Sequence, residues 1–516
     1  MSSSWVYDSQ TKSYQRPLGS SELAYYYPSL QNGLGDMFLH IAFRAQKRLV
    51  TTERVVGAWT VLRSRHPSLM SRVVEDENGI PRFRFSPYTK TEEALADTSQ
   101  VTYFKNDAKE KLISDYMNGP RTLSSSKLSY VIISERNPNS SQTEGEEAHA
   151  EYDLLMCAPH YLGDGASLHQ CTHELLCLLS NNSDTQLKAQ ILIDPNRDVD
   201  WHGILPLAAE TRLKPLISDT SRWAKAASEV NIAQTLRKEI GGHTFPRTPR
   251  GPQNTVLNEF AFTEEETSRI LAKCKKHAVT INNAMFIVCA VAWARVLGVK
   301  GKWEDPVMMY TAINLRPFLS PPPSIGGSHS PSYWFVALSY YNIVLPSFPP
   351  APTPEGKDSE RHGVFWYRTR NVKAQTRKIV VNSSFLKDRA LRMADFRAAR
   401  VIPRGRGKEV VLPTLPSQAS EAQAPSKCLL GLSLIGNLDS VYTRSSYARD
   451  ENNRPKIDLQ TVTTASRQKQ GGMLFLEHTF AGRLNLHLCW DENGFEDKVV
   501  EAFWDGVRGV VREYLL

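Results

Sequence analysis

The chain has 516 residues, a formal net charge of +8, and 41% hydrophobic against 22% charged residues. At roughly 150 residues per domain, this length predicts about two to four domains, which can bury large cores without disulfide or metal staples. Its seven cysteines include no C-x-x-C pair, which excludes a disulfide scaffold and a structural zinc ribbon and favours a reducing compartment.

Secretion, membrane insertion and nucleic-acid binding are also disfavoured. The N-terminal stretch lacks the apolar core of a secretory signal. The most apolar candidate helix, 286–299, contains Arg295 and is too short to span a bilayer. The balance of 62 basic and 54 acidic residues is moderate for this length. We therefore expect a cytoplasmic protein with no membrane span and no nucleic-acid partner.

The first half of the chain alternates between predicted strands and helices. Apolar spacing after Thr51 predicts a helix that Pro67 ends, and another helix is predicted from Ala166 to Leu179. The polar stretch 137–150 is typical of a surface loop. Apolar runs of strand length occur at three places: 37–43, 130–134 and 153–157.

The second half shows the same alternation. Thr263 and Glu266 form a predicted capping box at the start of a helix. Residues 306–314 are expected to form a buried strand that runs into Arg316. The other expected elements are a helix at 282–297, a hairpin of 473–480 and 484–490 that turns at 481–483, and a final helix at 495–515.

Strands interleaved with helices in both halves predict an α/β fold with mixed sheets and two domains of similar size. The expected domains are residues 1–195 and residues 253–516. Residues 196–252 lack a strong strand signal and end in a stretch rich in Gly and Pro, so they are interpreted as a linker or crossover region.

The sharpest candidate site is the sequence His160-Tyr-Leu-Gly-Asp164-Gly165, which lies between a predicted strand and a predicted helix. A neutral imidazole near pH 7 can take a proton from a hydroxyl or an amine. Asp164 could orient the histidine or fix the loop through an arginine, and Gly165 permits a backbone that a Cβ would forbid. A strand-end turn with a capping aspartate is the plainer interpretation of the same pattern.

The stretch 153–179 around His160 resembles the catalytic segment of the CoA-dependent acyltransferase superfamily, which includes chloramphenicol acetyltransferase, BAHD acyltransferases and condensation domains of peptide synthetases. Residues 17–28 resemble the opening strand and loop of that superfamily. Four further segments resemble it in the expected order: 52–73, 311–317, 432–439 and the C-terminal hairpin. Within the superfamily, the chain is most similar to fungal alcohol acetyltransferases such as the trichothecene 15-O-acetyltransferase group.

The resemblance implies two chloramphenicol-acetyltransferase-like domains with an active-site tunnel at their interface. The implied activity moves an acetyl or short acyl group from acyl-CoA to a hydroxyl of a fungal specialised metabolite, such as a sesquiterpenoid of the trichothecene type. His160 would be the general base, and Asp164 would pair with an arginine, for which Arg316 is the candidate. Acetyl-CoA would be a co-substrate, with no permanently bound cofactor, and a monomer is expected.

Two departures bear on the alternatives. Pro159 stands where condensation domains usually carry the first of two histidines, and the D-F-G-W-G signature of plant BAHD enzymes is absent. Two other functions stay open: a stand-alone condensation-type enzyme that takes its acyl group from a carrier protein, and a non-catalytic member that binds a metabolite. The combination of His160, Asp164 and Gly165 counts against the second, because binding alone needs no base at that turn.

Weaker candidates lie elsewhere in the chain. Ser433 or Asn437 could donate a hydrogen bond to an oxyanion, although a buried strand-end serine is the more common finding. His169 and His173 have the i, i+4 spacing of metal ligands, but no H-E-x-x-H motif or third ligand accompanies them. They are interpreted as helix-surface residues, and no metal is expected.

Positive charge is concentrated in residues 368–408, which hold thirteen Lys and Arg against Asp388 and Asp395, a local charge of +11. Such a run is usually a solvated helix face. In the resembled family this region lies in the half that holds CoA, whose phosphates need cationic partners. The segment is therefore a candidate phosphate-binding region, with no single residue favoured.

Overall fold

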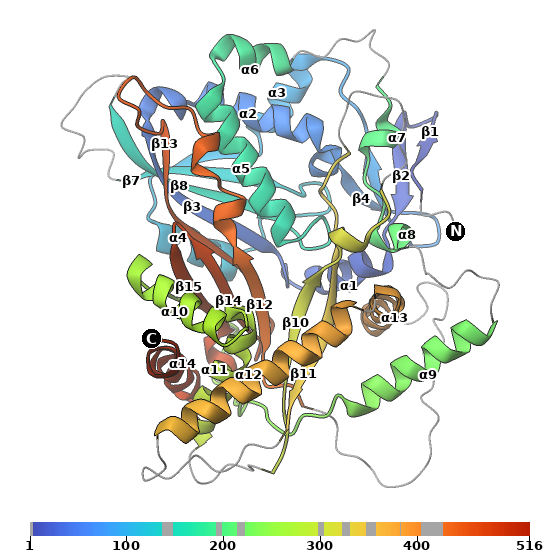
Figure 1. The fold of residues 1–516 in the computed structure, drawn as a ribbon. Coiled ribbons are helices and arrows are strands. Elements are labelled where there is room, and N and C mark those ends of the chain that lie inside the picture. Colours follow the sequence, from blue (N-terminus) through green and yellow to red (C-terminus); the bar gives the residue numbers. More distant parts are fainter. Residues whose placement is uncertain are drawn as a thin grey trace.

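The computed structural model describes residues 4–136, 148–191, 199–213, 222–297, 304–321, 331–346, 358–381, 383–403 and 427–516. Its strands form three sheets, two of them mixed, and helices lie against these sheets, which confirms the predicted α/β fold with mixed sheets (Figure 1). The expected loop at 137–150 lies largely outside the described residues.

The first mixed sheet lies in the upper lobe of Figure 1 and has the order β13-β3-β8-β7-β6. The strands are β13 (Ile457–Ser466), β3 (Met37–Gln46), β8 (His149–Ala158), β7 (Tyr130–Arg136) and β6 (Thr102–Lys105). The predicted strands of the first half are thus confirmed. β3 and β8 pair along their whole lengths and are buried on both faces, which places the end of β8 in the interior.

Two helices beside this sheet follow from local sequence signals. In α2 (Thr52–Arg65), the Thr51 side chain accepts a hydrogen bond from the Arg54 amide, as an N-cap should, and Pro67 begins the next turn. In α5 (Gly165–Asn181), Asp164 is the N-cap. The other helices of the first half are α1 (Ser20–Ser29), α3 (Thr91–Ser99), α4 (Lys109–Asn118) and α6 (Asp184–Ile191).

The second mixed sheet has the order β11-β10-β12-β14-β15-β9 and forms the lower lobe. The predicted hairpin is β14 and β15, and the left-handed backbone of Ala481 and Gly482 gives the turn that suits a two-residue hairpin. The strands are β11 (Leu338–Leu345), β10 (Val307–Asn314), β12 (Gly431–Asn437), β14 (Met473–Phe480), β15 (Arg483–Asp491) and β9 (Thr255–Ala261).

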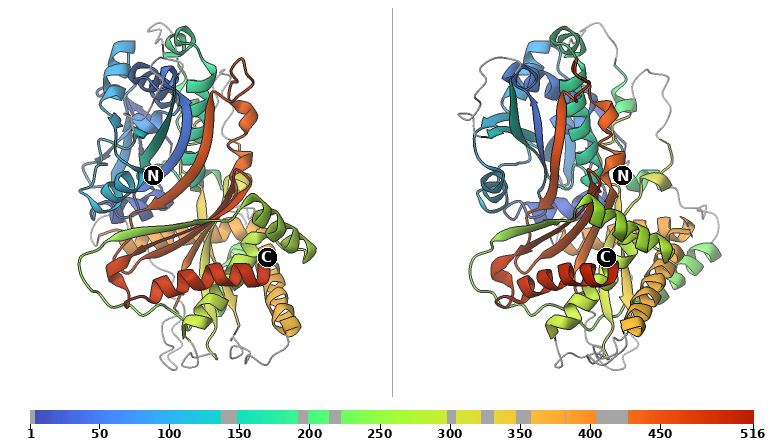
Figure 2. Two further views of the ribbon diagram at one scale, coloured as in Figure 1. Left: turned by 90° about the vertical axis from the view of Figure 1, so that its left-hand side faces the viewer. Right: turned by 60° about the vertical axis from the view of Figure 1, so that its left-hand side comes forward.

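The helices of the lower lobe lie mostly on one side of this sheet (Figure 2). They are α10 (Glu264–Lys276), which begins with the predicted Thr263–Glu266 capping box, α11 (Ile281–Leu297), α12 (Asp358–Val381), α13 (Ser383–Val401) and α14 (Val499–Leu515). Among the described helices, none is by itself long and apolar enough to cross a membrane; α10 and α11 meet that criterion jointly, with a bend of 98° between them.

The chain crosses between the lobes late in the sequence. After β12, residues 438–456 lead to β13, which pairs with β3 of the upper sheet before the chain returns to β14 (Figure 2). Residues 457–466 therefore do not belong to a purely C-terminal unit, although they lie in the expected domain 253–516. The domain boundaries themselves stay a prediction.

Two further regions differ from the expected organisation. The segment 196–252, interpreted as a linker, contains α7 (Trp201–Ile204), α8 (Ala209–Arg212) and α9 (Arg222–Lys238). The opening segment 17–28 is not a strand and loop, because α1 occupies most of it, and the Glu22 side chain accepts a hydrogen bond from the Gly19 amide at the start of the helix. A small antiparallel sheet precedes and follows α1, in the order β1 (Val6–Asp8), β2 (Ser13–Pro17), β5 (Pro81–Phe85) and β4 (Arg72–Glu75).

Candidate active site

His160 lies in the tight turn that joins β8 to α5. β8 is a buried interior strand, and the Leu162 amide donates to the Pro159 carbonyl across 3.0 Å, which closes the turn directly after the strand. A buried central strand therefore places the imidazole directly beyond its C-terminal end. The predicted strand, turn and helix around His160 are all present.

The contacts of His160 leave one ring nitrogen free for chemistry. Nδ1 lies 3.1 Å from the Gly163 carbonyl oxygen, which can only accept a hydrogen bond, so Nδ1 carries the hydrogen and Nε2 presents a lone pair. The ring stacks on Tyr25, with centroids 4.0 Å apart and planes 7° apart. The side chain is half-buried. Burial lowers the pKa of His160, so the imidazole is neutral, and able to act as a base, near pH 7.

Asp164 is buried and has a partner for each carboxylate oxygen. One oxygen accepts from the Ser167 amide at 3.2 Å, and the other accepts from Arg316 Nη1 at 2.8 Å and from the Ala337 amide at 2.9 Å. The expected ion pair between Asp164 and Arg316 is therefore present. It joins α5 to the segments that flank β10 and β11, so this carboxylate connects the two lobes.

Arg316 extends the same connection. Its Nη2 donates to Ser167 Oγ at 3.0 Å and to the carbonyl oxygens of Tyr333 and Phe335 at 3.2 and 3.1 Å. Arg316 follows β10 at the place where the sequence predicts it. These contacts occupy the guanidinium with protein groups, which favours a structural role for it.

The glycine that this turn requires is Gly163, whereas the sequence favours Gly165. A Cβ at Gly163 would lie 2.8 Å from the Trp334 ring, and Trp334 is itself buried. A Cβ at Gly165 would meet no heavy atom within 4 Å, and Gly165 is not among the residues with a left-handed backbone. The expectation that Gly165 permits a forbidden backbone is therefore wrong, and this position borders open space.

The two candidate oxyanion donors lie on β12. Ser433 is half-buried and pairs with Leu476 of β14. The Asn437 side-chain oxygen accepts hydrogen bonds from the Asp439 amide at 2.9 Å and from Thr479 Oγ1 at 3.3 Å, so it caps the short helical turn that follows. Their role toward an oxyanion stays a prediction.

The basic segment 368–408 divides into two regions. On α13, Arg389 pairs with Glu239 at 2.6 Å and Arg392 with Glu229 at 2.9 Å, so the charges of these two residues are already paired within the protein. On α12, four cations are exposed: Arg370, Lys373, Arg377 and Lys378. Of these, Lys373 donates to the Ala278 carbonyl. The cations at 404, 406 and 408 lie outside the described residues.

The histidine pair on α5 has a structural environment. His169 is buried, which corrects the expectation of a surface residue, and its Nδ1 lies 3.0 Å from Tyr442 Oη. His173 Nδ1 lies 2.9 Å from Tyr447 Oη. Both tyrosines belong to the crossover segment 438–456, so the two histidines hold that segment against α5. No group of three or more potential metal ligands occurs among the described residues.

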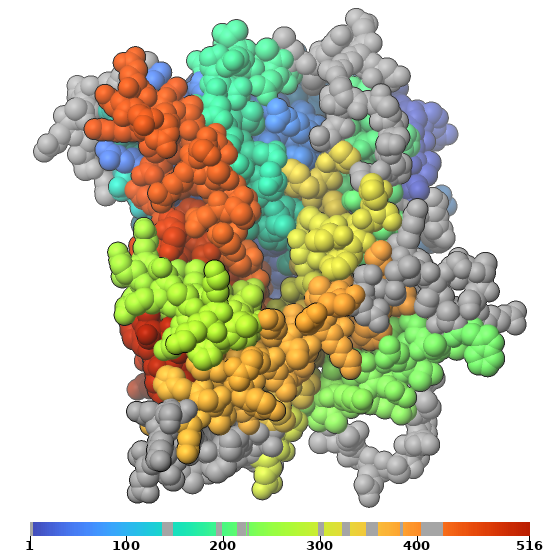
Figure 3. Space-filling model, in the orientation of Figure 1, coloured from blue at the N-terminus to red at the C-terminus, as the bar shows by residue number. Residues whose placement is uncertain are grey.

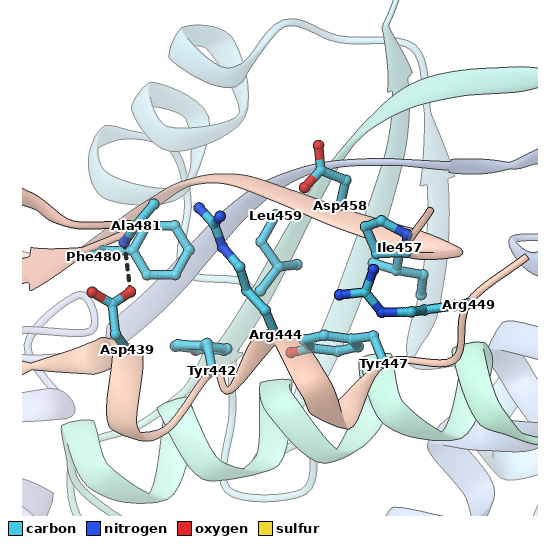
Figure 4. A pocket seen from close by; sticks show the side chains of 11 residues that line it. Asp439, Tyr442, Arg444, Tyr447, Arg449, Ile457, Asp458, Leu459, Phe480 and Ala481 are labelled. Atoms are coloured by element: carbon cyan, nitrogen blue, oxygen red, sulfur yellow. Dashed lines mark hydrogen bonds between the residues drawn. The ribbon is translucent and has the colours of Figure 1, made fainter. Parts of the chain in front are cut away.

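A pocket of about 260 Å³ lies on the other side of this crossover segment (Figure 4). Asp439 accepts hydrogen bonds from the amides of Ala481 and Gly482 at its edge. Two cations and two carboxylates line it together with aromatic and aliphatic side chains: Asp439, Tyr442, Arg444, Tyr447, Arg449, Pro455, Ile457, Asp458, Leu459, Phe480 and Ala481. Two residues that line the pocket, Tyr442 and Tyr447, contact His169 and His173 within α5, and His160 lies in the turn before that helix.

A hollow on the surface leads toward the candidate site. In Figure 3, the teal surface of the α5 region lies deeper than the orange surface of the crossover segment and the yellow surface around 331–346. The turn with His160 begins α5, so the hollow lies over the part of the fold that carries this residue. A tunnel through the interface stays a prediction.

Sequence reasoning missed three residues around His160: Tyr25 of α1, Tyr340 of β11 and Arg397 of α13. They lie in three distant parts of the chain and have no motif spacing. The runs Tyr25–Tyr27 and Tyr340–Tyr341 are visible in the sequence. Their meeting point is set by how α1, α13 and β11 pack, which no local pattern reveals.

No family model and no curated protein sequence matches this chain at the threshold used. Among solved structures, it is similar to trichothecene 15-O-acetyltransferase from Fusarium sporotrichioides, with a TM-score of 0.76 and 13% identity over 99% of this chain and 98% of that one.

Two other similar structures come from biosynthetic assembly lines. The condensation domain of the monacolin K polyketide synthase gives a TM-score of 0.57 at 11% identity, covering 99% and 98% of the two chains. The epimerization domain from the third module of tyrocidine synthetase B gives 0.56 at 12% identity, covering 97% of each. The chain therefore has the two-lobed fold of these acetyltransferase, condensation-domain and epimerization-domain structures, and this confirms the predicted fold.

Proposed function

We propose that this protein transfers an acetyl or short acyl group from acyl-CoA to a hydroxyl of a small specialised metabolite, such as a sesquiterpenoid of the trichothecene type. The observation that carries the proposal is His160, a neutral histidine with a free Nε2 at a turn between the two lobes of an acyltransferase fold. The acetyltransferase with a TM-score of 0.76 supports this donor and acceptor chemistry.

In the proposed reaction, His160 Nε2 removes the proton from the acceptor hydroxyl while the oxygen attacks the thioester carbonyl. The tetrahedral intermediate collapses with cleavage of the carbon–sulfur bond, and the imidazolium returns its proton to the departing CoA thiolate. No acyl-enzyme is formed. General-base catalysis contributes about 10²–10⁴-fold, and positioning of the two reactants supplies much of the remainder.

Asp164 and Arg316 support this reaction without taking part in proton transfer. The Asp164 carboxylate caps α5 and is bound by Arg316 and the Ala337 amide. Because its oxygens already accept these hydrogen bonds, Asp164 does not act as a general base. The pair holds the turn with His160 between the lobes. Ser433 or Asn437 remains our candidate donor to the oxyanion of the tetrahedral intermediate.

The leading alternative is a condensation-type enzyme that receives its acyl group from a carrier protein. The condensation and epimerization domains with similar folds support it. Two observations favour the CoA-dependent function: the higher TM-score of the acetyltransferase, and Pro159 at the position of the first histidine of condensation domains. For a non-catalytic binding protein, a histidine with a free nitrogen at this turn would have no purpose.

The donor preference tests the proposal. The purified protein is incubated with acetyl-CoA or with an acetylated carrier protein, each with and without a panel of hydroxylated sesquiterpenoids, and thiol release and acylated product are measured. We expect acceptor-dependent thiol release from acetyl-CoA. Transfer from the carrier protein alone would support the condensation-type function, and no transfer from either donor would contradict both enzymatic functions.

A further inference from the structure

Three side chains from distant parts of the chain meet beside His160. The Tyr25 and Tyr340 hydroxyls form a close hydrogen bond. The Arg397 guanidinium carbon lies 4.7 Å from the centroid of the Tyr25 ring and 4.5 Å from that of the Tyr340 ring. We call these three residues the tyrosine clamp. It connects α1 and β11 to α13, so residues of both lobes converge on one face of the imidazole.

The clamp restrains His160 in a way that the Gly163 hydrogen bond cannot. That bond, at 3.1 Å, holds Nδ1 but permits the ring to swing about it. The parallel stack against Tyr25 fixes the plane of the ring. Together the two contacts define the direction of the Nε2 lone pair while leaving Nε2 itself open to a substrate hydroxyl.

Tyr25 is itself anchored independently of His160. Arg16 and Glu22 form a buried bidentate ion pair at the start of α1, with both nitrogen–oxygen distances at 2.7 Å. Ser20 Oγ donates to Asp395 on α13 at 2.6 Å. α1 therefore has fixed contacts on both sides, and its tyrosine is a rigid surface rather than a loose side chain.

The charged groups that face His160 come from two elements. Asp164 of α5 favours the protonated imidazole, but the Arg316 ion pair offsets its charge. Arg397 of α13 disfavours protonation, and burial raises the pKa of the Tyr340 phenol beside it, so this phenol is neutral near pH 7. The clamp thus places a cation beside the histidine, where it opposes the effect of Asp164 on the His160 pKa.

We propose that Tyr25 is a positioning residue, held by Tyr340 and Arg397, that fixes the imidazole plane of His160 for proton removal from the acceptor. This inference rests on the proposed function and adds to it a residue set that determines the direction of the base. The inference also distinguishes Arg397 from the other cations of the basic segment, because Arg397 acts on His160 and does not bind the phosphates of CoA.

The test compares matched substitutions in the full-length protein. Tyr25→Leu removes the stacked ring, and Tyr25→Phe keeps the ring without its hydroxyl. Arg397→Met removes the cation, and Arg400→Met on the same helix is its control, because Arg400 is exposed. We expect Tyr25→Leu to lower kcat about tenfold or more with little change in the KM for acetyl-CoA, as for a misplaced catalytic group. Tyr25→Phe should retain most of the wild-type kcat.

The pH profile supplies a readout that a purely structural role would not change. Tyr25→Leu hydrates the imidazole and Arg397→Met removes a repelling cation, so both should move the acid limb of kcat/KM to higher pH. Arg400→Met should leave that limb in place. The His160 pKa is also measured without turnover, by NMR titration of the protein labelled with ¹³C-histidine. The signal of His160 is assigned as the one that is missing from the His160→Gln variant. Thermal unfolding is recorded for every variant.

The outcomes separate this inference from the proposed function. If the wild type transfers acetyl groups while folded Tyr25→Leu and Arg397→Met keep its kcat and acid limb, the inference is wrong and the function stands. If the wild type shows no transfer, the function fails, and the NMR titration still decides whether the clamp acts on His160. Should Tyr25→Leu fail to fold, Arg397→Met and its control decide the question.

Discussion

His160 and Asp164 are four residues apart in one turn, and their surroundings differ sharply. Asp164 is fully buried and its oxygens accept from Ser167, Arg316 and Ala337. His160 is half-buried, holds a single hydrogen bond through Nδ1 and leaves Nε2 free. A charged group whose bonding capacity is used by the protein stabilises the fold, whereas a group left with an open lone pair at a strand end is available for chemistry.

The same distinction applies to the cations of the second lobe. Arg389 and Arg392 of α13 are paired with glutamates, and they hold that helix to the preceding segment. On α12, Arg370, Arg377 and Lys378 are exposed. The sequence alone counts all of these charges equally, so a run of basic residues does not reveal which of them are available to a ligand.

The largest effect on stability is expected at the partnered end of the turn. Asp164→Asn leaves the half-buried Arg316 without its counter-charge, and breaking one member of a buried ion pair costs about 3–5 kcal/mol. Denaturant unfolding measures this loss. The double variant Asp164→Asn with Arg316→Gln should be more stable than the sum of the single losses predicts. Simple additivity would show that the pair contributes no coupling.

A smaller effect is expected from buried histidines that lie between the lobes. Burial lowers the pKa of His169 to about 3 and that of His487 to about 4, and it lowers the pKa of His478 as well. Below pH 6.5 these histidines therefore bind protons in the unfolded chain but not in the folded chain. The free energy of unfolding consequently falls as the pH falls toward 4. Burial raises the pKa of Glu477 to about 8, which offsets one histidine over this range.

For these three histidines and Glu477 together, we expect a loss of about 2 kcal/mol of unfolding free energy between pH 6 and pH 5, because one pKa unit corresponds to about 1.4 kcal/mol per group. Urea unfolding at the two pH values measures it. His487→Gln should reduce the pH dependence of the unfolding free energy by the contribution of one histidine. A variant that keeps the full dependence would show that His487 titrates normally in the folded state.

The smallest effect is expected at the exposed cations of α12. Charge reversal of Arg370, Arg377 and Lys378 should raise the KM for acetyl-CoA about threefold to tenfold at low salt, since each exposed ion pair is worth about 0.2–1 kcal/mol. The KM for a neutral acceptor should not change, and the effect should shrink as salt screens the charges. Reversal of three exposed cations of the first half serves as the control: Lys12, Arg44 and Lys90. Equal KM values for acetyl-CoA in both triple variants would show that the three cations of α12 face solvent and do not bind the CoA phosphates.

Much of the fold follows from local signals. The helix after Thr51, the Thr263–Glu266 capping box and the C-terminal hairpin are encoded within a few residues, and the structure contains all three. β13 could not be placed in this way, because its partner β3 is more than 400 residues away in the chain and only the tertiary fold selects it. The helix α1 was missed because the segment 17–28 was interpreted, from the resemblance, as an opening strand and loop.

The candidate site shows the same division. The strand, turn and helix around His160, and the arginine for Asp164, were predictable because each follows from an element boundary. The role of Gly165 was predicted incorrectly, since steric need at a glycine depends on a neighbour such as Trp334 that is distant in sequence. Tyr25 and Arg397 could not be predicted, because helix packing brings them to His160.

The central claim is that His160 is the base of an acyl transfer and contributes little to the fold. The most direct measurement compares acceptor-dependent thiol release from acetyl-CoA by the wild type and by His160→Ala, with thermal unfolding of both proteins. We predict a loss of about 10²–10⁴-fold in kcat with an unchanged unfolding temperature. A folded His160→Ala protein that retains more than about a tenth of the wild-type kcat would contradict this account.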